Sequence, residues 1–496
     1  MTRGGTVPDA GSLIPAPASL EVGTGPGFRF TPGVRLVTGP SPEEIALGVL
    51  AADLIGRRVG FPIDLLLGAG GDGQTVLFAL DDDAGPPAAD ARERYSLTVT
   101  GDRIELLAPR PAGLVRGLAT LRQLAAPGTG GELEVPATVI EDAPRYPWRG
   151  LSLDVVRHFV SVDEVKSLLT VMGDYKLNVL HLHLTDDQGW RIALPSRSLL
   201  TERSAQSEVG DGPGGFYTAE DYAGLLAFAA ARHITIVPEI DVPGHVNAAL
   251  HAYPDLTPSG QGADAYRGTE VGFSRLHRGL PATHAFLADA FSDLAAMTTG
   301  EYVHIGGDEV TAMEPDEYAW FVRTAQDILR GEGKTVVGWQ EIAAAPLDPG
   351  AVVQYWDTRA ESAPIVAAAA AGAKVLLSPG SKVYLDMKYD ASTALGLDWA
   401  GHVDLRDAYE WEPAELIPNL PARAIIGVEA AIWTETITTR DELYAMLLPR
   451  LAAVAEVAWS PAGSRDWAGF RGRVAGHARR WDDAGLAWYR SPQVDW

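Results

Sequence analysis

The chain has 496 residues, of which 65 are acidic and 40 are basic, so its formal net charge at pH 7 is −25. A surface of this sign repels nucleic acid and anionic membranes, and we expect neither as a partner. Cysteine is absent, which excludes a disulfide framework, a thiolate metal site and a cysteine nucleophile.

The first twenty residues contain no apolar stretch of signal-peptide length, and no later segment is apolar over the length of a membrane span. We therefore expect a soluble chain, either cytoplasmic or secreted with its leader removed. The composition leaves the oligomeric state open.

The distribution of tryptophan divides the chain. All thirteen tryptophans lie at or after Trp148, and we place a domain boundary between residues 1–142 and 143–496. Before the boundary, alternating apolar residues predict strands and amphipathic segments predict helices, as in a small α+β domain. These strands are expected within 28–39 and 95–108, and the helices at 41–60 and 114–126.

After the boundary, short apolar segments alternate with amphipathic helices, a pattern typical of a parallel sheet built from βα units. Eight strands are expected, at 150–154, 178–184, 234–240, 302–306, 335–339, 352–356, 374–378 and 425–433. The clearest helices are expected at 161–176, 217–232, 283–297 and 439–459. The predicted fold class is α/β: a TIM (β/α)8 barrel preceded by the smaller α+β domain. No GxGxxG or Walker motif suggests a nucleotide site.

The active site of a TIM barrel lies at the carboxyl ends of its strands, and polar or aromatic residues follow every predicted strand. In strand order they are Asp154 and Arg157; Asp186 and Asp187; Glu239, Asp241 and His245; Asp308 and Glu309; Trp339 and Glu341; Trp356 and Asp357; Tyr384 and Asp386; Trp433 and Glu435. Carboxylates and an arginine can hydrogen-bond sugar hydroxyls, while indole rings can pack on the C–H faces of a sugar. These residues at the strand ends therefore favour a carbohydrate ligand.

The segment HIGGDE, residues 304–309, ends in two neighbouring acids, Asp308 and Glu309. Successive side chains of a strand point to opposite faces, so neighbours serve one pocket only where the chain bends. Gly306 and Gly307 can adopt the backbone angles that such a bend requires.

The sequence also allows less specific interpretations. His181 and His183 form an HxH pair like that of metal-dependent amidohydrolases. Such a site would need further histidines at later strand ends and a bridging lysine or acid, whereas the strand ends here offer mainly tryptophan and carboxylates. His304 is interpreted as a core histidine. Asp186 and Asp187 could serve as a helix cap and a turn residue.

Taken together, these segments resemble the family 20 glycoside hydrolases, the β-N-acetylhexosaminidases. The resemblance covers the barrel from end to end in family order, and the small domain resembles the non-catalytic domain that precedes many of these barrels. The matching segments are LSLDVVRHF (151–159), NVLHLHLTDDQGWR (178–191), GGFYTAEDY (214–222), ITIVPEIDVPGH (234–245), HIGGDE (304–309), VVGWQE (336–341), VVQYW (352–356), VYLDMKYD (383–390) and IWTE (432–435).

The resemblance implies substrate-assisted catalysis, in which the 2-acetamido group of the sugar is the nucleophile. Glu309 would be the general acid and then the base, Asp308 would orient the acetamido group, and Tyr384 would hydrogen-bond its carbonyl oxygen. The charge on Asp308 should keep Glu309 protonated to higher pH than a free glutamate, which predicts a mildly acidic optimum.

The remaining roles also follow from the resemblance. Trp339, Trp356 and Trp433 would wall the pocket, and Arg157, Asp386 and Glu435 would hold the hydroxyls of the terminal sugar. Asp186 and His245 would tune Glu309, and Trp399 would stack on the next sugar. No metal and no cofactor are implied.

The predicted function is an exo-acting, retaining β-N-acetylhexosaminidase that removes terminal β-linked GlcNAc and GalNAc from an oligosaccharide or small glycoside. Two alternatives stay open: a metal-dependent amidohydrolase built on His181 and His183, and a catalytically silent sugar-binding protein. The natural glycoside, the preference between GlcNAc and GalNAc, and secretion are not determined.

Overall fold

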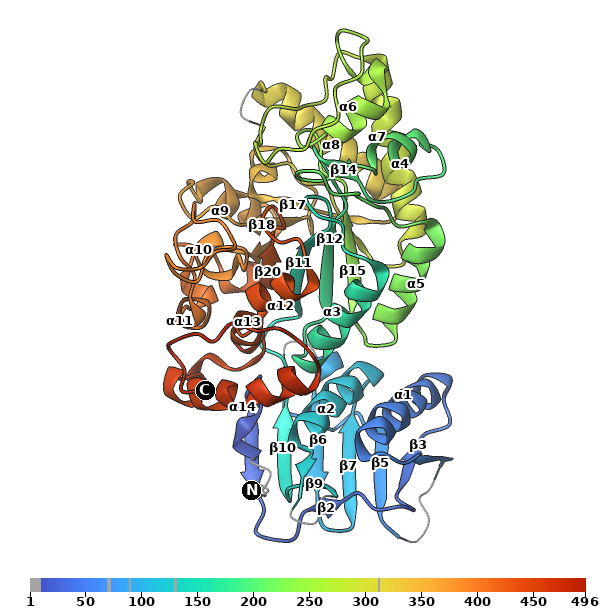
Figure 1. Cartoon of the computed structure of the whole chain (residues 1–496), viewed down its shortest axis with the longest axis vertical. Helices are drawn as coiled ribbons and strands as arrows, with labels where there is room; N and C mark the ends of the chain where they lie inside the picture. The colour runs from blue at the N-terminus through green and yellow to red at the C-terminus, as the bar shows by residue number, and fades with distance from the viewer. Residues whose placement is uncertain (1–9, 69–72, 89–90, 129–131, 311–312) are drawn as a thin grey trace.

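The computed structural model describes residues 10–68, 73–88, 91–128, 132–310 and 313–496. A barrel surrounded by helices forms the larger part, and a smaller sheet domain lies against one end of it (Figure 1). Among the described residues, none of the helices combines the length and apolar character needed to cross a membrane.

The small domain is built on a seven-stranded mixed sheet with two helices, as an α+β domain requires. Helix α1 (Pro42–Val59) starts from a capping box between Ser41 and Glu44 and ends at Gly60 in the left-handed conformation, so its predicted bounds hold. Helix α2 (Pro111–Leu124) begins earlier than predicted, because Pro111 suits the first turn of a helix. The sheet order is β1 (Ser19–Val22), β10 (Thr138–Asp142), β6 (Tyr95–Val99), β7 (Arg103–Ala108), β5 (Thr75–Leu80), β3 (Arg35–Thr38) and β4 (Asp64–Leu67), with β2 (Phe28–Arg29), β9 (Leu133–Val135) and β8 (Ala126–Pro127) in a second sheet.

The larger domain is a closed barrel of eight parallel strands, which confirms the predicted fold class. The first strand pairs with both the second and the last, and this pairing closes the ring. All eight predicted strands are present, with ends that shift by at most two residues. They are β11 (Trp148–Asp154), β12 (Val179–His183), β15 (Thr235–Glu239), β16 (Tyr302–His304), β17 (Thr335–Trp339), β18 (Val352–Tyr355), β19 (Lys374–Leu377) and β20 (Ile425–Ile432).

Helices cover the outside of the barrel (Figure 1). The predicted helices at 161–176, 217–232 and 283–297 are present as α3, α5 and α7. The single helix predicted over 439–459 is wrong: α12 and α13 meet at Pro449, which lacks the backbone N–H that would continue the helix. The helices of this domain are α3 (Val162–Asp174), α4 (Leu199–Ser204), α5 (Ala219–Ala230), α6 (Asn247–Ala252), α7 (Pro281–Met297), α8 (Pro315–Gly331), α9 (Ala363–Ala370), α10 (Gly380–Val383), α11 (Leu405–Tyr409), α12 (Arg440–Leu447), α13 (Arg450–Trp459) and α14 (Trp467–Asp483).

The interior of the barrel is filled in two layers beneath the carboxyl ends of the strands. Apolar side chains near the strand starts close the lower end: Trp148, Val179, Val237, Val337, Val352 and Leu376. Above this floor lies a layer of buried polar side chains: His181, Glu239, His304, Gln354 and Glu429. The barrel is therefore a packed core, and its polar layer lies toward the carboxyl ends of the strands.

The two domains meet through buried ion pairs. Asp142, at the end of β10, accepts hydrogen bonds from Tyr95, from Lys176 at 2.8 Å and from the indole of Trp459. Glu93 bridges Arg116 and Arg149, each at 2.7 Å. We propose the domain boundary between residues 142 and 143, next to this contact.

Candidate active site

A pocket of about 340 Å³ opens at the carboxyl ends of the barrel strands. A larger cavity, of about 730 Å³, lies at the opposite end of the barrel, where residues of the strand starts and of the small domain line it. The active sites of TIM barrels lie at the carboxyl ends, so the smaller pocket is the candidate site.

Eleven of the twelve predicted site residues line this pocket. They are Arg157, Asp186, His245, Asp308, Glu309, Trp356, Tyr384, Asp386, Trp399, Trp433 and Glu435. Trp339 differs from the expectation that it walls the pocket: its indole is only 1% exposed and donates from Nε1 to Glu239 Oε1 at 2.9 Å. It packs behind Trp433, with ring centroids 5.9 Å apart, because the last residue of β17 points into the barrel.

A tight turn brings Asp308 and Glu309 to one pocket. Strand β16 ends at His304, and Gly306, Gly307 and Glu309 have positive φ angles of 68°, 104° and 55°. A Cβ on Gly306 would lie 1.8 Å from Asp241 Oδ1, so no larger residue fits this conformation. The bend predicted at the two glycines is confirmed, and it turns both neighbouring carboxylates toward the same space.

The carboxylate of Glu309 faces a buried imidazole. Nε2 of His245 lies 3.3 Å from Glu309 Oε2, and Nδ1 of the same ring lies 3.0 Å from Asp186 Oδ1. Burial lowers the pKa of His245, but the Asp186 carboxylate outweighs this effect and holds the pKa well above its ordinary value. The ring is therefore a cation that Asp186 fixes in place beside Glu309.

Asp186 is held by charge in turn. It lies in a short hairpin, β13 (Thr185–Asp186) and β14 (Gly189–Trp190), directly after β12. Its Oδ2 is 2.8 Å from the guanidinium of Arg157. Burial raises the pKa of Asp186, yet Arg157 and His245 hold it well below its ordinary range, so this carboxylate stays ionised.

Asp308 lies deeper than Glu309, with side chains that are 12% and 32% exposed. Burial raises the pKa of Asp308 to about 6; His245 opposes this rise, and the neighbouring Glu309 adds to it. The expectation that Glu309 holds its proton to higher pH stays a prediction.

Aromatic rings form one side of the pocket. Trp356 and Tyr384 stack with centroids 6.3 Å apart and an interplanar angle of 12°. Trp399 meets both rings edge-on at 5.7 Å and is 36% exposed, so it stands at the mouth. Trp433 completes the wall, 6.2 Å from Tyr384 and 5.1 Å from the guanidinium of Arg157.

Two further carboxyl groups line the pocket. Burial and the nearby Glu435 raise the pKa of Asp386 well above its ordinary value. Burial also raises the pKa of Glu435, against the opposing charge of Arg157. Buried groups of this kind are costly unless they bind a polar ligand, and sugar hydroxyls can both donate to and accept from them.

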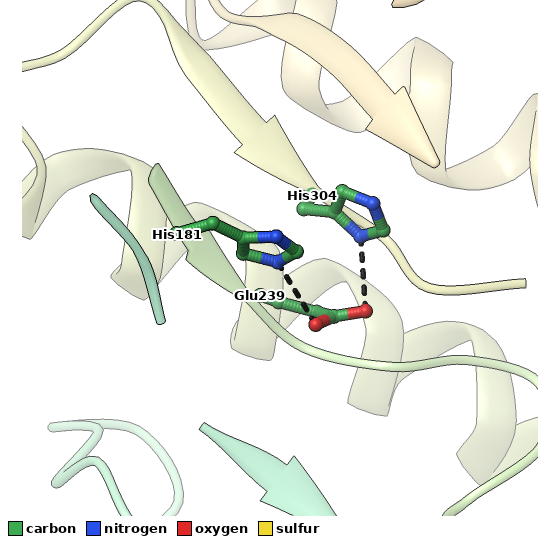
Figure 2. A group of neighbouring side chains, drawn as sticks. All are labelled: His181, Glu239 and His304. Carbon is green, nitrogen blue, oxygen red and sulfur yellow. Dashed lines mark hydrogen bonds and ion pairs between the residues drawn. The ribbon is translucent and has the colours of Figure 1, made fainter. Parts of the chain in front are cut away.

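The histidines that suggested a metal site belong to a buried hydrogen-bond network. Figure 2 shows Glu239 reaching His181 through one oxygen, at 2.9 Å, and His304 through the other, at 3.0 Å. The two imidazoles stack with centroids 4.4 Å apart. His183 contacts Glu239 at 2.6 Å and Asp186 at 2.9 Å through its two ring nitrogens. The ring nitrogens of His181 and His183 are therefore engaged by carboxylates. His304 lies in the core as predicted.

The predicted site left out several residues that the structure brings to the pocket. Asp241 follows β15 by two residues, so the strand-end rule was enough to select it. Thr269 and Val271 line the mouth from a long connection without a motif, and no sequence signal identifies them. Glu341 does not line the pocket itself but contacts a residue that does: it accepts a hydrogen bond from the indole of Trp356 at 3.2 Å, and burial raises its pKa to about 8.

Comparison with known proteins agrees with this geometry. Residues 146–462 match the model of the glycosyl hydrolase family 20 catalytic domain, and residues 10–143 match domain 2 of the same family. A β-N-acetylhexosaminidase of Cellulomonas fimi is 58% identical over 490 residues, which cover 99% of this chain and 98% of that protein.

Solved structures give the same result. The N-acetyl-β-hexosaminidase of Streptomyces plicatus in complex with thio-NAglucal superposes with a TM-score of 0.93 at 43% identity, covering 98% of each chain. The exo β-N-acetylglucosaminidase of Vibrio harveyi in complex with N-acetylglucosamine has a TM-score of 0.85 at 29% identity, covering 99% of this chain and 80% of the other. The barrel, the pocket of acids and indoles, and the full-length relatives all agree. The chain therefore belongs to glycosyl hydrolase family 20 and is a glycoside hydrolase.

Proposed function

We propose that this glycoside hydrolase is an exo-acting β-N-acetylhexosaminidase, which removes terminal β-linked GlcNAc and GalNAc with retention of configuration. The observation that carries this proposal is the turn at Gly306 and Gly307, which presents Asp308 and Glu309 to one pocket. The complexes of relatives with N-acetylglucosamine and thio-NAglucal support the sugar class.

The arrangement of the acids favours substrate assistance. A conventional retaining glycosidase places its acid and its nucleophile about 5 Å apart on opposite sides of the scissile bond. Consecutive residues of one turn are poorly suited to this division. If the acetamido oxygen of the sugar attacks the anomeric carbon, the enzyme needs one acid at the leaving oxygen and one carboxylate beside the acetamido nitrogen.

In this proposal Glu309 protonates the leaving oxygen and then, as a carboxylate, activates the water that opens the oxazolinium intermediate. Its partial exposure gives it access to both the aglycone and the water. Asp308 accepts a hydrogen bond from the acetamido N–H and balances the positive charge of the intermediate. Tyr384 donates to the acetamido oxygen, which holds it in line for attack.

The rest of the pocket would define the substrate. Trp356 and Trp433 enclose the acetamido methyl and the sugar face, while Arg157, Asp386 and Glu435 bind the hydroxyls. The sugar would enter by its non-reducing end and leave the next residue at the mouth, beside Trp399. The proposed ligand is thus an oligosaccharide or small glycoside with a terminal N-acetylhexosamine.

The test is hydrolysis of p-nitrophenyl β-N-acetylglucosaminide, the matching β-N-acetylgalactosaminide and the matching β-glucoside, with and without EDTA. We expect rapid release from the two acetamido sugars, no effect of EDTA, and no release from the glucoside. The initial product should be the β anomer by NMR. Asp308→Asn should be strongly impaired. Equal turnover of the glucoside would show that the enzyme supplies its own nucleophile and would overturn the proposal.

A further inference from the structure

Two buried carboxyl groups meet at the base of the pocket. With main-chain and side-chain atoms counted together, Asp241 is 1% exposed and Asp308 is 9% exposed. A carboxyl oxygen of each and a ring nitrogen of His245 lie within 4.8 Å of one another. Among the described residues, Asp241 Oδ2 and Asp308 Oδ1 receive no hydrogen bond from any donor, so no donor offsets the approach of the two carboxyl groups.

Two buried carboxylates this close repel each other, which favours the protonated form of one of them. A protonated carboxyl group can donate a hydrogen bond, whereas an ionised one can only accept. The environment of Asp241 shows which atom carries the proton. The backbone N–H of Gly307 donates to Asp241 Oδ1 at 3.0 Å, so this oxygen acts as an acceptor. The other oxygen, Oδ2, is the atom left to carry the proton and to donate it toward Asp308.

We propose that Asp241 is a positioning residue held as a neutral carboxylic acid, which donates a hydrogen bond to the catalytic carboxylate of Asp308. The titratable groups around Asp241 act in both directions. Glu239 and Asp308 are acidic and disfavour a further negative charge, whereas His245 and His183 favour one. Burial, with Asp308 adding, raises the pKa of Asp241 well above its ordinary value, against the opposing effects of His245 and His183.

This inference rests on the proposed function for its chemical meaning. If Asp308 accepts the acetamido N–H, the hydrogen bond from Asp241 occupies one of its oxygens and leaves the other free for the substrate. A carboxylate that already accepts a hydrogen bond is a weaker base. Asp308 can then balance the charge of the oxazolinium without removing its proton.

Gly306 provides the space for this arrangement. A Cβ at this position would lie 1.8 Å from Asp241 Oδ1, and Gly307 donates the bond that orients the same oxygen. The turn that presents the two catalytic acids therefore also fixes the rotation of the Asp241 carboxyl group.

The test compares Asp241→Asn with Asp241→Ala. Asparagine keeps the shape and a donor but cannot ionise, so kcat should stay within about tenfold of the unmodified enzyme. Alanine removes the donor, and kcat should fall about 100-fold, as when one preorganised donor is lost. Should the asparagine variant fail to fold, Asp241→Ser supplies a hydroxyl donor for the same comparison with alanine.

Infrared spectroscopy gives a readout that does not depend on activity. At neutral pH the difference spectrum between the unmodified protein and Asp241→Asn should contain the carbonyl band of a protonated carboxylic acid, shifted in D2O. The subtraction removes the bands of other buried acids, such as Asp386 and Glu341. Equal loss of kcat in the asparagine and alanine variants, or no difference between the infrared spectra, would overturn the inference. Absence of hexosaminidase activity with the band present would instead contradict the proposed function and leave the neutral acid established.

Discussion

The imidazole of His245 and the carboxylate of Glu309 approach to 3.3 Å, with the ring held as a cation by Asp186. A cation at this distance can donate a charge-assisted hydrogen bond that holds the Glu309 carboxyl group in place. We expect His245→Gln, which removes this charge, to lower kcat/KM about tenfold across the pH profile. An unchanged kcat/KM would show that His245 does not act on Glu309.

The acid side of the same profile should report Asp308. Its pKa is raised to about 6, so its charge is present above this pH and is lost as the pH falls through it. We expect kcat/KM to decline below about pH 6, a higher value than an ordinary aspartate with a pKa near 4 would give. In Asp308→Asn this decline should vanish from the residual activity. Persistence of the decline would assign it to another group.

Gly306→Ala should abolish most of the activity, because the new methyl would push the Asp241 carboxyl group out of its position. Gly333→Ala is a matched control: Gly333 also has a positive φ, of 72°, but a Cβ there meets nothing within 4 Å. The control should lose only about 1 to 2 kcal/mol of stability and keep its kcat. Similar kcat losses in both variants would point to backbone strain instead of the contact with Asp241.

Trp399→Ala should affect the aglycone more than the terminal sugar. Removing one aromatic face is expected to lower kcat/KM for chitobiose about threefold to tenfold, and to change methyl β-N-acetylglucosaminide little. Phe273→Ala is the control, since Phe273 is 49% exposed and packs on Tyr266 outside the pocket. An equal effect on both substrates would show that Trp399 binds the terminal sugar.

Asp142→Asn should destabilise the contact between the domains. It would leave Lys176 buried without its 2.8 Å partner, and breaking a buried pair costs about 3–5 kcal/mol. Asp82→Asn breaks an exposed pair with Arg110, which contributes about 0–1 kcal/mol. Unfolding in guanidinium chloride measures both. Equal midpoints would show that the buried pair contributes no more than the exposed one.

The strands of the barrel were predictable because buried parallel strands are short, apolar and regularly spaced along the chain. The polar residues that follow the strands were equally predictable, because the carboxyl ends of all the strands lie at the same end of the barrel. The structure was needed for features that depend on the direction of a side chain or on distant neighbours. Trp339 is the last residue of its strand, whereas Trp356 and Trp433 each follow theirs by one residue. The indole of Trp339 points to Glu239 and not into the pocket.

The location of charge could not be predicted from spacing. Two neighbouring acids can be found in the sequence, but their burial cannot, and burial raises the pKa of Asp308 to about 6. Likewise, the apolar periodicity of 439–459 continues through Pro449, while the helix does not. Local patterns specify which elements form, but the ionisation of a group depends on residues far away in the sequence.

The layer of Glu239, Glu429 and their histidine partners fills the barrel directly below the pocket, so the pocket is closed at its lower end. A bound glycan can neither thread through nor slide forward after a cut. The released aglycone has to depart before the cleaved monosaccharide, which lies deeper, can follow through the same mouth. On the proposed function, a long chain would be shortened in separate encounters, one sugar for each association, and intermediates of every length should accumulate during the digestion.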